Sequence, residues 1–193
     1  MVELLLPSHD ATVSAADAGE VDLLPHLGPA DVGVAAGGLR TVVTRSRREE
    51  FLVPDGLEPA IVTALSLATD RSALIPGAYP LARGRNLALA RLLLNGARPQ
   101  VHLAIPCNDA VRANEAGSLS AQWQEAGVTT QVSCGPAAGP VLRLTADQAP
   151  APAGAVPLLL WPGVRAVSPR LHGFLPNDTS ATDFWNAADW WLS

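Results

Sequence analysis

The stretch VHLAIPCNDAVRAN (Val101–Asn114) decides the fold class predicted for this chain. Val101–Ile105 is a short apolar run that is typical of a buried strand. Asn108 and Asp109 follow it, and both residue types commonly cap the start of a helix. The helix body is expected to run to Glu125. A strand that passes directly into a helix in this way is one half of a βαβ unit.

Helix and strand signals alternate on both sides of this stretch. Upstream, EPAIVTALSLATD (58–70) and RNLALARLLLN (Arg85–Asn95) both predict helices, the second ending at an Asn-Gly pair. Downstream, apolar runs predict the strands Thr129–Val132, Pro140–Leu144 and Leu158–Trp161. This order predicts an α/β fold of three layers, in which helices flank a mostly parallel sheet.

The two ends of the chain carry weaker signals. We expect a first strand at Val2–Leu6, and a hairpin or meander from DVGVAA (31–36), TVVT (41–44) and Phe51–Val53. The C-terminal FWNAADWWLS (184–193) predicts an aromatic helix. We therefore expect an α/β domain over 1–148. Residues 149–193 would supply a Pro/Ala-rich connector, a final strand and the helix, packed on the same domain or docked on a partner.

Composition limits the function classes. The 193 residues include 48% hydrophobic and 16% charged residues, which predicts a globular chain rather than a disordered one. Lysine is absent, so Schiff-base and P-loop lysine chemistry are excluded. The net charge is −5, so nucleic-acid binding is not expected.

No apolar stretch reaches the roughly 18 residues of a membrane span. The start, MVELLLPSHD, lacks a basic signal region, so the predicted location is the cytoplasm.

Cys107 lies at the predicted carboxyl end of a strand, where ligands bind in open α/β sheets. A helix N-terminus lowers the pKa of a thiol, so Cys107 is a candidate nucleophile or acid/base, and His9 is a candidate activating partner. The alternative is a small buried residue at an ordinary helix cap. Cys134 follows one βα unit later, so we do not expect the two sulfur atoms to face each other. No histidine or cysteine spacing predicts a metal site.

The sequence IPCNDA (Ile105–Ala110) is similar to the PCNTAH-type motif of the cofactor-independent aspartate/glutamate racemase superfamily. DRSALIPG (Asp70–Gly77) and the helix that follows it also resemble a segment of that family, so the resemblance covers about residues 70–112. It implies that Cys107 moves a proton at the substrate α-carbon, that Asn108 binds the substrate carboxylate, and that no cofactor is needed. Asp109 stands where the family has a threonine.

Other residues suggest further binding roles. Arg71 and Arg85 flank a Pro/Gly-rich loop and are candidates for an anion clamp. Asn108 and Asp109 are two further candidates for substrate binding. Tryptophan is favoured at interface hot spots, so Trp185, Trp190 and Trp191 are candidates for partner binding.

Two functions therefore stay open. The first is a small-molecule enzyme that uses Cys107 for proton transfer or nucleophilic attack on a carboxylated metabolite, as in a racemase or isomerase. The second is a non-catalytic assembly or partner-binding subunit that uses the Trp-rich C-terminus. Formation of a homo-oligomer is left open in both.

Overall fold

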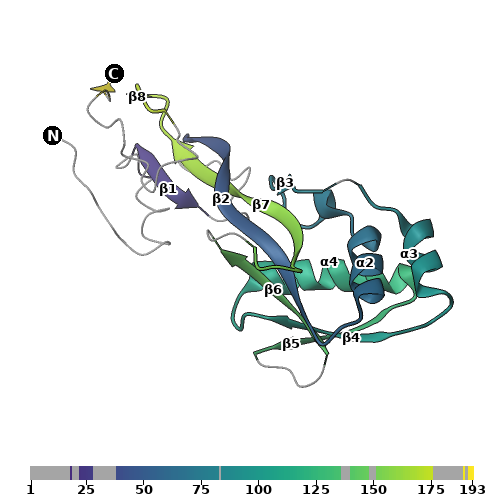
Figure 1. The fold of residues 1–193 in the computed structure, drawn as a ribbon. Helices are drawn as coiled ribbons and strands as arrows, with labels where there is room; N and C mark the ends of the chain where they lie inside the picture. Colours follow the sequence, from purple (N-terminus) through teal and green to yellow (C-terminus); the bar gives the residue numbers. More distant parts are fainter. Residues whose placement is uncertain are drawn as a thin grey trace. The chain divides into compact units, whose positions relative to one another are not determined.

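The computed structural model describes residues 18, 22–27, 38–82, 84–135, 140–147, 151–175, 189 and 191–193 (Figure 1). The helices and strands that the argument uses are, in chain order, β1 Leu23–Leu27, β2 Arg40–Asp55, α2 Pro59–Ala68, the 3-10 turn η2 Arg71–Ala73, β3 Tyr79–Pro80, α3 Leu87–Leu94, β4 Gln100–Ile105, α4 Ala110–Ala126, β5 Thr129–Cys134, β6 Val141–Asp147, β7 Val156–Val167, β8 Leu171–His172 and β9 Trp191–Leu192.

The chain divides into two compact units. The first combines 1–46 with 162–193, and the second comprises 47–161. Strands β2 and β7 contribute residues to both units. All the helices named above belong to the second unit, which also holds the site described below.

The fold is α/β, as predicted, but its sheet is not mostly parallel. Among the described residues, hydrogen-bonded strands follow the order β1-β7-β2-β6-β4-β5, and β3 also pairs with β7. Strand β4 is parallel to β5 and β6, whereas β2 pairs antiparallel with β6, and β1 and β3 pair antiparallel with β7. The sequence alternation correctly indicated the local parallel pair, but pairings between distant segments made the sheet mixed.

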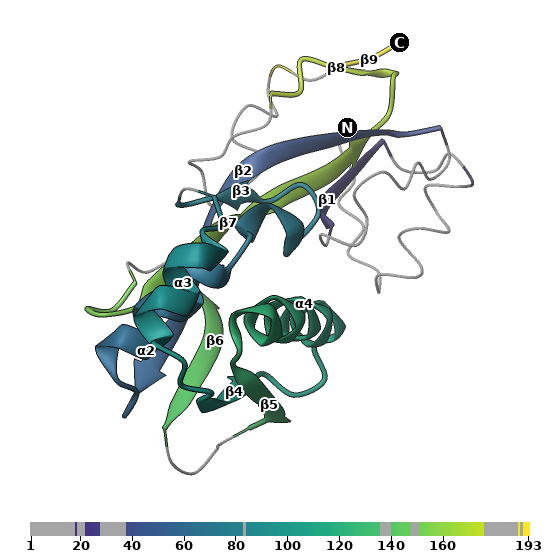
Figure 2. The same ribbon diagram turned by 90° about the vertical axis from the view of Figure 1, so that its right-hand side faces the viewer.

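The prediction of three layers is also wrong. Figures 1 and 2 show α2, α3 and α4 gathered on one side of β4, β5 and β6. The three helices contact one another, and α4 also contacts β4 and β5. The main core of the second unit lies between these helices and the strands, with side chains such as Leu65, Leu103, Leu119 and Leu142.

The predicted caps at Asp109 and Asn95 are formed, and Asn86 adds a cap at the start of α3 that the sequence analysis did not predict. Asn86 Oδ1 accepts a hydrogen bond from the Leu89 N–H at 3.0 Å at the start of α3, and the helix ends at Asn95 with φ 47°. Asp109 Oδ1 accepts from the Arg112 N–H at 3.0 Å at the start of α4, which ends at Gly127 with φ 98°. These contacts satisfy backbone groups that the helix ends would otherwise leave unpaired.

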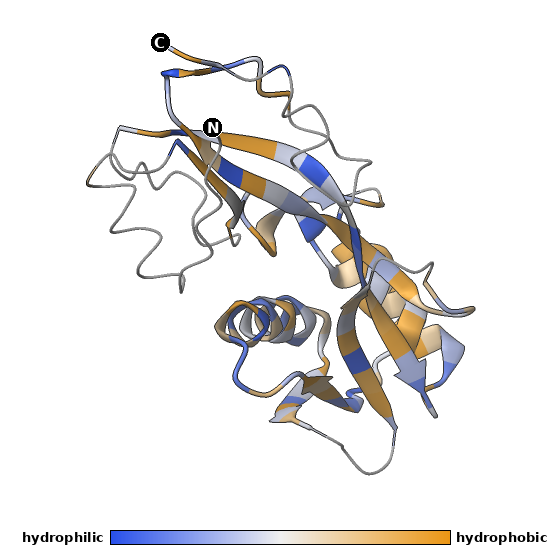
Figure 3. Ribbon diagram, turned by 90° about the vertical axis from the view of Figure 1, so that its left-hand side faces the viewer, coloured by the Kyte–Doolittle hydropathy of each residue, from blue (hydrophilic) through white to orange (hydrophobic). Residues whose placement is uncertain are grey.

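Hydrophobic patterning explains which helix faces are buried. Figure 3 shows hydrophobic and hydrophilic residues interspersed around α4. The buried residues of α4 include Ala116, Leu119 and Trp123, which recur at intervals of three and four positions and so share one face. Trp123 of α4 is fully buried, and its indole N–H donates to Thr69 Oγ1 at 3.0 Å. Burial of a tryptophan requires such a partner for its single polar atom.

The structure contradicts one part of the hairpin or meander expected near the N-terminus, the turn between its second and third strands. The runs 41–44 and 51–53 lie in one continuous strand, β2, so no turn separates them. The segment 31–36 and the expected strand Val2–Leu6 lie outside the described residues.

The predicted C-terminal helix falls largely outside the described residues, which omit 176–188 and 190. Trp191 lies in strand β9, not in a helix, and β9 pairs antiparallel with β8. The Trp191 ring stacks on the His172 ring with a centroid distance of 4.0 Å.

Candidate functional site

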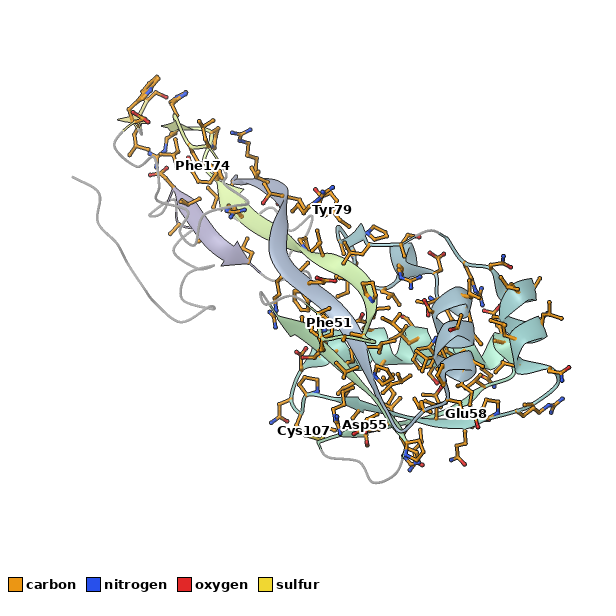
Figure 4. The ribbon with its side chains drawn as sticks, viewed as in Figure 1. Phe51, Asp55, Glu58, Tyr79, Cys107 and Phe174 are labelled. Atoms are coloured by element: carbon orange, nitrogen blue, oxygen red, sulfur yellow. A yellow bond between two sulfur atoms is a disulfide. The ribbon has the colours of Figure 1, made fainter. Side chains whose placement is uncertain are left out.

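Cys107 and Cys134 form a disulfide across the carboxyl ends of β4 and β5. The parallel register places Ile105 opposite Cys134, which brings the residue two positions after β4 close to the end of β5. The Cα atoms of the two cysteines are 4.8 Å apart. Figure 4 shows Cys107 at this end of the strands. The expectation that the two sulfur atoms would not face each other is therefore wrong.

The disulfide removes the chemistry predicted for Cys107. The residue does follow a strand, is exposed and precedes a helix, as expected. A nucleophile or acid/base at this position requires a thiolate, however, and both cysteines of the described chain are in the disulfide. The predicted function as a cysteine-dependent racemase or isomerase is therefore wrong.

The disulfide also contradicts the predicted cytoplasmic location. Disulfides persist in oxidising compartments, whereas cytosolic thiols are kept reduced. Within the described residues, none of the α-helices has the length and apolar composition of a transmembrane span.

Asn108 and Asp109 form the turn between the disulfide and α4. Asn108 is exposed and has φ 60°, a left-handed conformation that asparagine tolerates better than most residues. Asp109 is half-buried, and its carboxylate caps α4 while lying 3.8 Å from Arg112 Nε. Asp109 thus has a structural role as a helix cap, and the predicted role of both residues in substrate binding stays a prediction.

Arg71 and Arg85, the predicted anion clamp, lie in the second unit. Arg85 Nε donates to the Ala68 carbonyl at 2.8 Å, and Arg85 Nη2 lies 3.0 Å from Glu125 Oε2. Arg71 is buried, with an exposed fraction of 5%, and its guanidinium reaches Ser66 and Pro157. Binding of an anion by either side chain stays a prediction.

A groove of about 500 Å³ has Ser66 and Pro157 in its wall, and both accept hydrogen bonds from the Arg71 guanidinium. It is lined by the end of β2, one face of α2, Gly154 and Ala155, and the first two residues of β7. Most of its lining side chains are apolar, and Thr63 and Ser66 of α2 supply the hydroxyl groups. The sequence analysis did not identify this groove, because its walls come from two segments, 54–66 and 154–157, that are distant in sequence. The hydrogen bond from Arg71 to Pro157 likewise joins residues 86 positions apart.

A second polar feature is a buried charged cluster under α4. Arg112 is 1% exposed and forms ion pairs with Glu50 of β2 and, at 3.6 Å, with Glu115. Glu50 also accepts a hydrogen bond from the Trp161 indole N–H at 2.5 Å. The guanidinium carbon of Arg112 lies 4.7 Å from the Trp161 ring centroid, which adds a cation–π contact.

The cluster shifts the titration of its members. Burial raises the pKa of Glu115 to about 7, although Arg112 opposes this shift and Asp109 adds to it. Burial lowers the pKa of Arg112 to about 10, and Glu115 opposes that shift. No local sequence signal identified the cluster, because Glu50 and Arg112 meet only in the folded chain.

The remaining predicted site residues are not brought together in the part of the chain that the structure describes. His9, Trp185 and Trp190 lie outside it. Trp191 is described and is 57% exposed. The described residues contain no group of three or more His, Cys, Asp or Glu side chains that could hold a metal ion.

No protein family matches the chain at the level of sequence, and no curated protein does so either. Solved structures share its fold. CtaP, an ABC transporter substrate-binding protein of Listeria monocytogenes, is 14% identical with a TM-score of 0.76, over 96% of this chain and 58% of that chain. The oligopeptide-binding protein AppA of Bacillus subtilis, in complex with a nonapeptide, is 13% identical with a TM-score of 0.62, over 98% of this chain and 59% of that chain.

NikA of Staphylococcus aureus, in complex with Ni(L-His)2, is 10% identical with a TM-score of 0.64, over 88% of this chain and 57% of that chain. The chain thus spans less than two thirds of the length of these three structures. Identities this low show a shared fold only. CtaP and AppA, which share the fold, are binding proteins and not racemases, so the racemase resemblance of residues 70–112 is wrong.

Proposed function

We propose that this chain is a solute-binding polypeptide that captures a small organic molecule or short peptide outside the cytoplasm and does not transform it. The observation that carries the proposal is the similarity to CtaP, a substrate-binding protein, which extends over 96% of this chain. Other solved structures with this fold are described as complexes with a nonapeptide or with a nickel–histidine complex. A binding role also agrees with the disulfide at Cys107, which leaves that residue no thiol for catalysis.

The proposal extends to delivery of the solute to a membrane transporter. CtaP is named as a substrate-binding protein of an ABC transporter. A disulfide persists in an oxidising compartment outside the cytosol. A solute that is imported would be collected on that side of the membrane.

Ligand-dependent stabilisation of the full chain tests this function. A ligand that binds only the folded state raises the free energy of unfolding by about 2.7 kcal/mol when its concentration is 100 times its Kd. We expect at least one short synthetic peptide, or Ni(L-His)2, to raise the melting temperature and to be recovered unchanged. A folded chain that none of these probes stabilises would contradict the proposal, as would chemical conversion of a bound probe.

A further inference from the structure

The guanidinium of Arg71 contacts two residues that line the groove beside α2. Its Nη2 donates to Ser66 Oγ at 2.8 Å and its Nη1 to the Ser66 carbonyl at 3.2 Å. Its Nε donates to the Pro157 carbonyl at 3.0 Å. All these acceptors are neutral, and no carboxylate of the described chain pairs with Arg71.

Arg71 therefore places an uncompensated positive charge behind the wall of the groove. Burial lowers the pKa of Arg71, but an arginine side chain still remains charged in a protein at neutral pH. A buried charge without a partner of opposite sign is costly. A negatively charged group in the groove would offset that cost.

Ser66 links this charge to the groove. Its Oγ accepts the hydrogen bond from Arg71, which leaves the hydroxyl hydrogen available as a donor. Within the described residues, this hydroxyl donates to no acceptor, unlike that of neighbouring Thr63, which donates to the Pro59 carbonyl at 2.8 Å. A hydroxyl polarised by a guanidinium is a stronger donor than an isolated one.

Asp70 directly precedes Arg71, but its Oδ1 accepts hydrogen bonds from the Ser72 N–H and hydroxyl. Two other acidic residues adjoin lining residues at the end of the groove away from Ser66. Asp55 and Glu58 flank the turn between β2 and α2 (Figure 4), and Asp55 is paired with Arg143 at 2.7 Å. Ser66 is eight positions after Glu58, a rise of about 12 Å along a helix. An anionic group at Ser66 would thus lie well away from these carboxylates, and an apolar body could extend along α2.

We propose that the groove binds a monocarboxylate with an apolar body, whose carboxylate accepts a hydrogen bond from Ser66 Oγ while Arg71 supplies the positive charge behind it. This inference rests on the proposed solute-binding function, because it names the chemical group by which a captured solute would be held. A single donor and one guanidinium suit one negative charge, and the apolar walls suit a hydrocarbon chain.

Titration of the full chain with hexanoate, followed by NMR, tests the site. We expect hexanoate to shift the amide signals of Ser66 and Gly154, and the uncharged hexanamide to bind more weakly. Ser66→Ala should weaken hexanoate binding about tenfold, the loss expected for one hydrogen bond to a charged group. Thr63→Ala is the matched control, because its hydroxyl lines the same groove but is already bonded to α2, and it should change binding less than twofold.

Ser66→Thr retains the hydroxyl and should retain hexanoate binding. This variant shows whether Ser66→Ala weakens binding by removing the hydrogen-bond donor or by disturbing the structure. Absence of hexanoate binding to the folded chain, or equal binding by Ser66→Ala, would overturn the inference. These failures are distinguishable from failure of the proposed function. A peptide that stabilises wild type and Ser66→Ala equally would leave solute binding in place while rejecting this groove as its site.

Discussion

At the scale of single residues, the most unusual feature is the buried cluster around Arg112. One guanidinium lies near three carboxylates, those of Glu50, Asp109 and Glu115. Neither Glu115 oxygen accepts a hydrogen bond in the described part of the chain. A fully buried carboxylate without hydrogen bonds favours its neutral form, because burial penalises charge more than Arg112 compensates for it.

Glu115 should therefore make the stability of the fold depend on pH. Its pKa is about 7 in the folded chain, above the ordinary value of 4.5, so the folded state holds more protons between these pH values. The free energy of unfolding should consequently fall as pH rises through this window, by about 3 kcal/mol in total at about 1.4 kcal/mol per pKa unit. Glu115→Gln should lack this decrease. Urea unfolding of both proteins between pH 4 and 8 measures the difference.

The exposed Glu125 on the same helix gives the matched control for this experiment. Glu125→Gln should retain the decrease between pH 4.5 and 7, because it leaves the buried Glu115 in place. If Glu115→Gln and wild type differed by a constant amount at every pH, Glu115 would not be the group responsible.

At the scale of secondary-structure elements, the disulfide joins the ends of β4 and β5 and borders the turn that starts α4. The two cysteines are separated by 27 positions. In the chain-entropy account, a cross-link that closes a loop of this length stabilises the fold by about 3.5 kcal/mol. Cys107→Ser with Cys134→Ser should lower the free energy of unfolding by about this amount and leave the helix content unchanged. Urea unfolding followed by far-UV circular dichroism measures both quantities.

Alkylation gives an independent check of the same bond. Both cysteines are exposed, so a free thiol at either position would be accessible to iodoacetamide. Intact-mass spectrometry of the oxidised protein should show no label before reduction and two labels after it. Labelling without a reductant would contradict the disulfide and would reopen thiol chemistry at Cys107.

At the scale of the whole molecule, the described residues of the two compact units form buried apolar clusters of different size. The second unit has an extended core that includes α2, α3, α4 and the strands β4 and β6. In the described part of the first unit, the buried clusters contain three residues each. Regions with less buried apolar surface open at a lower free-energy cost.

Hydrogen exchange should reveal this difference. We expect amides of β4 and β6 to exchange more slowly than those of β1 and β8, by about tenfold or more, because their exchange requires opening of the larger core. Exchange followed by NMR under native conditions measures the rates segment by segment. Equal protection in the two sets of strands would show that both units open in a single cooperative step.

The sequence by itself determined the α/β class, the helices α2, α3 and α4, and the strand segments that follow them. Their signals are local, since an Asn or Asp cap and a run of apolar residues act within one or two turns of chain. It also named Arg71 as a candidate for anion binding, which stays a prediction. It gave no signal for Ser66, whose position beside Arg71 depends on how α2 is followed by η2.

Only the tertiary structure decided the strand order, the disulfide, the groove and the buried charges. Each joins residues that are distant in sequence, as in the hydrogen bond between Trp161 and Glu50, which are 111 positions apart. Periodicity and capping report which face of an element is apolar and where the element ends. They carry no information on which element will cover that face, because the choice depends on how all the apolar surfaces of the chain are buried together.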